Sequence, residues 1–154
     1  MSLDPSTEDL HGAGLDEHAA GSAEPVVLSM PARPEMWALA RMTVSLVASR
    51  IELGYEEISD LRLAIDELCT LCALGSTEAS RLTLTFSTDD EGVRIECVAE
   101  PLGPVSPGHR DDEIVGLVPA QLSERILEAL VDGHGIAEEP GVRRGWLRKL
   151  RPSG

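Results

Sequence analysis

Long apolar runs are missing from this 154-residue chain. No stretch approaches the roughly 18 consecutive apolar residues that a membrane-spanning helix needs, and the N-terminus lacks the basic and then apolar pattern of a secretory signal. We therefore expect a cytoplasmic protein that does not bind a membrane. Hydrophobic residues make up 42% of the chain, which is long enough to bury about two-thirds of its unfolded surface in one domain.

Cysteine is also scarce, and the total of three is an odd number that argues against a disulfide framework. Cys69 and Cys72 have the C-x-x-C spacing of metal and redox sites. A zinc site needs two more ligands, however, and the other cysteine and the histidines show no paired spacing that would supply them. A redox cysteine uses a helix N-terminus to lower its pKa, whereas this pair falls deep inside an expected helix. We interpret both as buried core residues, with a metal or redox site as the alternative.

Basic residues are few, because 13 Lys and Arg stand against 27 Asp and Glu, for a formal net charge of −14. Such a charge disfavours nonspecific attraction to nucleic acid or to an anionic membrane. We therefore expect a protein partner and no direct nucleic-acid contact. The positive charge gathers near the C-terminal end, at Arg143, Arg144, Arg148, Lys149 and Arg151. We interpret these residues as the protecting charges of a solvated edge strand.

The chain divides into an acidic tail and one domain. Residues 1–24 contain Asp and Glu but no Lys or Arg, interleaved with Gly, Ala, Ser and Pro. Such a segment cannot bury enough apolar surface to offset the entropy of ordering. We predict a disordered tail over residues 1–24 and a folded domain over residues 25–151.

Hydrophobic periodicity predicts the elements of that domain. In chain order we expect a strand at 26–30, a helix at 34–53, a helix at 58–74, a hairpin over 82–99, a loop at 100–118, a helix at 120–133 and a hairpin of 136–138 with 143–150. Pro34 suits the first turn of the first helix, and Gly54 is expected to cap its end. The last helix is expected to present Leu122, Ile126 and Leu130 on one side.

The second helix carries a carboxylate pair, Asp66 and Glu67, beside a stripe of apolar residues. The stripe recurs at spacings of 3, 4, 3 and 4 and consists of Ile58, Leu61, Ile65, Leu68 and Cys72. Two amphipathic helices of this kind, followed by a hairpin, resemble the anti-sigma-factor serine kinases of the histidine-kinase-like ATPase superfamily. ERILEALVDG and RRGWLRKL are similar to the third helix and last strand of that family. The resemblance covers about residues 26–150 and implies an α/β two-layer sandwich, with one mixed, mainly antiparallel sheet and helices on one face.

In that family an E-x-x-x-N motif on the second helix supplies a general base and a magnesium ligand. The resemblance places Glu67 at the base and Leu71 at the metal-ligand position. A solvated surface carboxylate is the alternative role for Glu67. Because Leu71 cannot ligate Mg²⁺, the resemblance implies a vestigial catalytic position and no metal.

The nucleotide motifs of the family are altered as well. Glu100 stands at the adenine-binding Asp of a D-x-G-x-G motif, in which Leu102 and Pro104 replace the glycines around Gly103. Ser123 stands at a glycine of the loop that closes over the phosphates. We therefore expect no cofactor, since phosphoryl transfer depends on positioned phosphates and metal charge.

With these catalytic and nucleotide motifs altered, the resemblance still implies the family's binding function, which needs no phosphate transfer. It implies an anti-sigma regulatory factor that sequesters an RNA polymerase sigma factor and exchanges it for an anti-anti-sigma protein. A family-like homodimer is also expected. Arg41 lies in an A-R-x-T-V pattern that the family uses for partner contacts on its first helix, and a surface Arg that covers the helix with its stem is the alternative. Two other functions stay open: an active serine/threonine kinase that uses Mg-ATP, and a remnant that only dimerises or binds another regulator.

Overall fold

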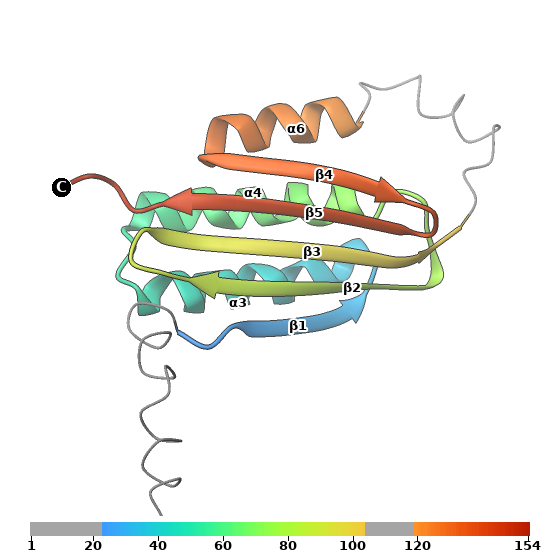
Figure 1. Ribbon diagram of the computed structural model, residues 1–154, viewed down its shortest axis with the longest axis horizontal. Coiled ribbons are helices and arrows are strands. Elements are labelled where there is room, and N and C mark those ends of the chain that lie inside the picture. The colour runs from blue at the N-terminus through green and yellow to red at the C-terminus, as the bar shows by residue number, and fades with distance from the viewer. Residues whose placement is uncertain (1–22, 104–118) are drawn as a thin grey trace, which may run out of the picture.

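The computed structural model describes residues 23–103 and 119–154. Most of the predicted acidic tail and most of the predicted loop at 100–118 lie outside the described residues. The elements are β1 (Val26–Pro31), the 3₁₀-helix η1 (Pro34–Met36), α3 (Trp37–Arg50), α4 (Tyr55–Cys72), β2 (Ser76–Thr88), β3 (Gly92–Leu102), α6 (Pro119–Leu130), β4 (Gly133–Glu139) and β5 (Val142–Leu150). The helices lie on one face of the sheet, so the predicted two-layer α/β sandwich is confirmed (Figure 1).

The sheet has the strand order β1-β2-β3-β5-β4, and each of these four pairings is antiparallel. The prediction that the basic C-terminal segment forms an edge strand is wrong, because β5 lies between β3 and β4. The edge position belongs to β4, which is short and presents exposed Ala137, Glu138 and Glu139. Charged residues on a short strand suit an edge, whereas β5 buries Gly145 and Leu147 against the helices.

The core forms between the inner face of the sheet and helices α3 and α4. The predicted alternation of β2 and β3 is confirmed, because their inward residues are almost completely buried: Leu82, Leu84, Phe86, Val93, Ile95, Cys97 and Ala99. The stripe on α4 is buried from Leu61 to Cys72, as its spacing predicted. These contacts hold α4 against the centre of the sheet.

The turn between α3 and α4 differs from the prediction. Glu52, and not Gly54, takes the left-handed backbone conformation, with φ of 59°. The amide of Leu53 then returns to Ala48 O at 3.2 Å, and the Leu53 side chain is buried. Gly54 instead has extended backbone and caps the start of α4. The chain therefore turns at the position that buries Leu53, although this places Glu52, a non-glycine residue, in the less favourable left-handed conformation.

The buried face of α6 also differs from the predicted apolar side. Leu122 is 44% exposed, whereas Ser123 and Leu127 are buried. The helix packs mainly on α4 rather than on the sheet. Its orientation follows a polar contact with α4, which is described below.

The three cysteines are buried, as expected for core residues. Contact with Cys97 together with burial raises the pKa of the Cys72 thiol, and contact with Cys69 together with burial raises the pKa of Cys97. Within residues 23–103 and 119–154, no group of three or more His, Cys, Asp or Glu side chains is arranged to hold a metal ion. In the same part of the chain, no helix is long and apolar enough to cross a membrane.

Candidate functional site

Glu67 and Ser123 meet where α6 packs on α4. The Ser123 hydroxyl donates a hydrogen bond of 2.6 Å to Glu67 Oε2. Ser123 is only 3% exposed, and Glu67 is half-buried. A hydroxyl bonded to a carboxylate is one of the stronger hydrogen bonds that a neutral side chain can make. The Glu67 carboxylate, for which the resemblance implied a general base, is thus bonded by a side chain of the same chain.

Leu71 lies one turn further along α4 and is 3% exposed. Its aliphatic side chain offers no oxygen to a magnesium ion, which takes oxygen ligands. The Leu71 carbonyl instead accepts a hydrogen bond from Arg143 Nη1 at 3.4 Å, and the same nitrogen donates to the carbonyl of Leu74. Arg143 is buried and forms an ion pair with Glu138 at 3.0 Å. The Arg143 guanidinium therefore donates hydrogen bonds at the C-terminal end of α4, where positive charge is favourable.

Glu100 does not join this group. Its neighbour Ala99 is buried under the helices, so the alternation of β3 places the exposed Glu100 side chain on the other face of the sheet, opposite Arg81. The two amides that follow are already bonded, from Leu102 to Gly141 O at 2.8 Å and from Gly103 to Gly75 O at 3.1 Å. The structure therefore brings Glu67 and Ser123 together, with Leu71 one turn further along α4. It separates Glu100 from them and uses the amide of Gly103 within the fold. Pro104 lies outside the described residues.

Arg41 lies on the outer side of α3 and is tied to α4. Its Nη1 bonds Asp66 Oδ1 at 2.8 Å, and both side chains are 34% exposed. One turn away, Trp37 Nε1 bonds Thr70 Oγ1 at 3.3 Å. Asp66 was visible in the sequence as part of a carboxylate pair, but its partner Arg41 was not, since the two residues are 25 positions apart. The pairing fixes the Arg41 guanidinium at the surface rather than leaving it mobile.

A row of exposed apolar side chains flanks Arg41 and was not predicted from the sequence. This row, which we call the α3 stripe, consists of Leu39, Met42 and Leu46, with exposed fractions of 40%, 69% and 64%. Leu63 of α4 is 58% exposed as well. The spacing of 3 and 4 was a visible signal, because it gives α3 a second apolar face beside the buried one. Clustered exposed apolar residues rimmed by polar ones mark interaction sites.

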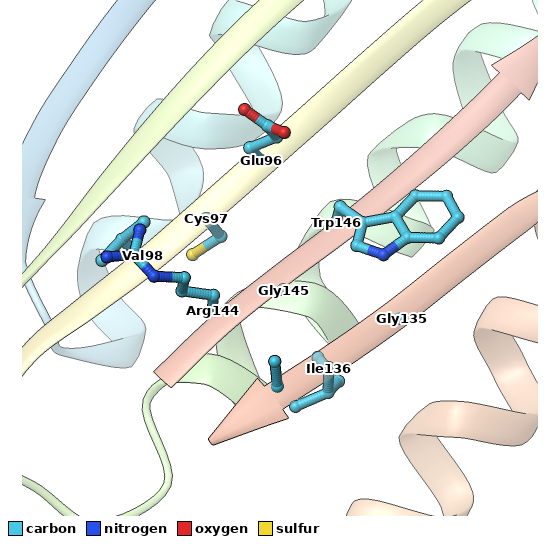
Figure 2. A pocket seen from close by; sticks show the side chains of 9 residues that line it. Glu96, Cys97, Val98, Gly135, Ile136, Arg144, Gly145 and Trp146 are labelled. Atoms are coloured by element: carbon cyan, nitrogen blue, oxygen red, sulfur yellow. The ribbon is translucent and has the colours of Figure 1, made fainter. Parts of the chain in front are cut away.

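A separate hollow of about 370 Å³ opens on the helix-free face of the sheet, across β3, β5 and β4 (Figure 2). The Trp146 ring forms one wall and lies over Gly133 and Gly135, where an added Cβ would come within 3.2 and 2.5 Å of the indole. The Arg94 guanidinium lies 4.6 Å from the ring centre. This hollow is on the opposite side of the sheet from Glu67, so it is distinct from the α4–α6 contact.

Comparison with known proteins gives curated relatives of similar length, among them three serine-protein kinases. The serine-protein kinase RsbW of Bacillus pumilus is 47% identical over 135 residues, which cover 76% of this chain and 80% of the relative. The RsbW of Listeria monocytogenes is 40% identical over 131 residues, covering 76% and 82%. The RsbW of Bacillus subtilis is 27% identical over 143 residues, covering 84% and 88%. No protein-family model matches the chain.

Among solved structures, the crystal structure of the RsbU and RsbW domains of Rv1364c from Mycobacterium tuberculosis is similar in fold. The TM-score is 0.57 with 18% sequence identity, over 85% of this chain and 34% of that one. The present chain therefore spans about a third of the length of that structure. At this identity the likeness establishes the shared histidine-kinase-like ATPase fold.

Proposed function

This chain belongs to the anti-sigma serine-protein kinase family, and from that membership we propose that it is an anti-sigma regulatory factor. It binds an RNA polymerase sigma factor in the cytoplasm and sequesters it. An anti-anti-sigma protein competes for the same chain and releases the sigma factor, which is partner switching. The observation that carries the proposal is the α3 stripe around Arg41, an exposed apolar surface on the helix that the family uses for partner contacts.

The chemistry of that surface suits a protein partner. Arg is enriched among the residues that dominate binding energy, and apolar neighbours that exclude water strengthen its contacts. The bond to Asp66 orients the Arg41 guanidinium before a partner arrives, which lowers the ordering cost of binding. Met42 is flexible and polarisable, so it adapts to two different partners, as partner switching requires.

We propose further that the chain does not transfer phosphate and needs no cofactor. Three observations support a degenerate nucleotide site: Leu71 gives no metal ligand, Ser123 occupies the Glu67 carboxylate, and the amides of Leu102 and Gly103 are bonded within the fold. Phosphoryl transfer relies on metal charge and on positioned phosphates. Among the described residues 23–103 and 119–154, those at the family's nucleotide-site positions offer neither a metal ligand nor free amides for the phosphates.

The second candidate is an active ATP-dependent serine/threonine kinase that phosphorylates an anti-anti-sigma factor. One observation favours it, namely that Glu67 keeps the general-base carboxylate while the curated relatives are named serine-protein kinases. Under this alternative, Mg-ATP would be the cofactor. Nucleotide binding separates the two candidates. Self-association as a homodimer is compatible with both, and sedimentation of the purified chain tests it.

The test of the leading proposal is a calorimetric titration of the full chain with each purified sigma factor of its source organism. Met42→Asp should weaken the interaction at least tenfold, because it puts a charge into an apolar contact. Val27→Asp is the matched control, since Val27 is 62% exposed but lies on β1, away from α3. The proposal fails if no sigma factor binds, or if both variants lose affinity equally.

A further inference from the structure

Two exposed arginines lie near the α3 stripe, although the chain as a whole carries −14. Helix α3 contains two arginines, Arg41 and Arg50, and no Asp or Glu. Arg62 projects from the neighbouring helix α4. Arg50 and Arg62 are exposed, and neither makes an ion pair with another described residue. An acidic ligand with apolar side chains could pair with the arginines and pack on the α3 stripe at the same time.

The packing of the two helices places Arg62 beside the stripe. The Trp37–Thr70 and Arg41–Asp66 bonds are one turn apart on each helix, which shows that α3 and α4 run antiparallel side by side. One more turn along α3 reaches Ser45 and Leu46, and one more turn back along α4 reaches Arg62. The exposed Leu46 is thus next to a guanidinium that no described carboxylate neutralises.

The N-terminal segment of the chain enters the fold at the end of this surface. Ala23 and Glu24 line the same small cavity as Arg50 and Ile51, at the C-terminal end of α3. Twenty-two further residues precede Ala23. They contain acidic residues and no Lys or Arg. Any docking of this segment on α3 is therefore an intramolecular event with a short tether.

The composition of residues 8–17 complements the stripe. Leu10 follows the acidic pair Glu8 and Asp9, and Leu15 precedes the acidic pair Asp16 and Glu17. Each leucine can cover part of an apolar surface while its acidic neighbours meet the flanking arginines. Phosphate and nucleic-acid ligands would offer negative charge without such apolar anchors. The pattern thus favours this segment as the occupant.

The lengths agree as well. A random coil with the separation in sequence of Leu15 from Ala23 would span about 16 Å, and one with the separation of Leu10 from Ala23 about 20 Å. Along α3, Arg50 lies about 12 Å from Met42 and about 16 Å from Leu39. A tether whose mean length matches the span gives an effective concentration in the millimolar range. Even a weak contact is then substantially populated.

We propose that residues 8–17 dock on the α3 stripe, with Leu10 and Leu15 on its apolar side chains and the acidic pairs toward Arg50 and Arg62. The docked segment covers the surface that a protein partner would use, so it acts as an internal competitor. Docking itself is a property of this chain alone. The competition rests on the proposed function, because it needs a partner that binds α3.

Docking is tested by paramagnetic relaxation in the full chain. A nitroxide attached to Ala13→Cys is read out at the methionine methyl groups by ¹³C NMR, since the three native cysteines are buried and Met42 is 69% exposed. The control carries the same label in a tail with Glu8→Gln, Asp9→Asn, Asp16→Asn and Glu17→Gln. Attenuation of the Met42 signal should be at least twofold stronger with the native tail. It should fall to the control level when Arg50→Glu and Arg62→Glu are introduced together.

Equal attenuation in the native and neutralised tails would overturn docking, because it would reflect only random excursions of the tether. Attenuation that grows with protein concentration would overturn it too, because the tail would then bind a second copy. For the competition, the neutralised tail should tighten sigma-factor binding about threefold. Unchanged affinity beside a positive relaxation result overturns the competition alone. If no sigma factor binds, the proposed function fails, and the competition fails with it, while docking is decided by the NMR result.

Discussion

Replacing Arg143 should destabilise the fold more than any other single change to a basic residue of β5. Its guanidinium donates to the carbonyls of Leu71 and Leu74 and pairs with Glu138, while its side chain is only 9% exposed. Arg143→Met keeps much of the apolar stem but removes the donors. The carbonyl of Leu74, just past the end of α4, then loses its guanidinium donor, while the Leu71 carbonyl loses one donor and keeps the Leu74 amide at 3.4 Å.

The magnitude follows from these contacts. A hydrogen bond from a charged donor contributes about 1.5–3 kcal/mol, and the longer contact to Leu71 contributes less. The pair with Glu138 adds little, because that carboxylate is 69% exposed. We expect a loss of about 3 kcal/mol in the free energy of unfolding. For a domain of this size the loss corresponds to a fall of roughly 6–12 °C in melting temperature.

Urea denaturation monitored by circular dichroism measures this change. Arg144→Met is the matched control, because Arg144 is the adjacent residue, is exposed and makes no hydrogen bond or ion pair with another described side chain. Its variant should stay within about 0.5 kcal/mol of the native chain. If Arg143→Met also stays within that range, the guanidinium does not hold the end of α4 and the reasoning is refuted.

Three other predictions concern nucleotide, partner and pH. Mg-ATP at 1 mM should raise the melting temperature by less than about 2 °C. Leu71→Asn should not change this result, because it restores one metal ligand but no room for the phosphates. A saturable rise above about 5 °C would favour the kinase. Arg41→Ala should weaken sigma-factor binding by about 2 kcal/mol, and unchanged affinity in a titration would return Arg41 to a purely surface role. Burial opposes ionisation of Asp89, but hydrogen bonds from the backbone amides of Glu91 and Gly92 and from Arg148 outweigh it and lower the pKa of Asp89. The stability that this carboxylate contributes is present above its unfolded pKa of about 3.9 and is lost as the pH falls through the lower folded value. Asp89→Asn should therefore flatten the acid limb of a stability–pH curve, and an unchanged limb would argue against this assignment.

Local patterns predicted the elements of this fold well where a single surface is buried. The alternation of Leu82, Leu84 and Phe86 and the stripe of α4 each face one apolar neighbour, so period and burial coincide. Helix α6 shows where this argument stops. It has apolar residues on more than one side, and Leu127 rather than Leu122 is buried because the Ser123 hydroxyl has a partner on α4. A helix with two apolar sides needs its tertiary contacts to choose between them.

The site was less predictable, because its contacts join residues far apart in sequence. The Ser123–Glu67 bond spans 56 positions and the contact from Arg143 to Leu71 spans 72. A charge in such a contact looks the same in sequence as a solvated one, which is why Arg143 was interpreted as a surface charge. The wrong position predicted for β5 has the same cause, because no local sequence pattern indicates that β5 lies between β3 and β4.

The role of Glu67 can be decided by a pair of variants. In a kinase the carboxylate must accept a proton, so Glu67→Gln would abolish phosphorylation of an anti-anti-sigma protein. In the binding protein that we propose, the carboxylate is an acceptor for Ser123, which the amide oxygen of Gln can replace. Glu67→Gln should then cost less than about 1 kcal/mol of unfolding free energy, because a neutral hydrogen bond remains.

Ser123→Ala supplies the complementary measurement. It removes the donor from a buried position and should cost about 1–2 kcal/mol, because the bond joins a hydroxyl to a carboxylate. Sigma-factor affinity should be unchanged in both variants, because the α3 stripe lies on another helix from Ser123 and does not include Glu67. If Ser123→Ala is neutral in stability while Glu67→Gln abolishes measurable phosphate transfer, the carboxylate is a catalytic base rather than a structural acceptor. The proposed loss of chemistry would then be wrong, and the kinase would replace the binding protein as the function of this chain.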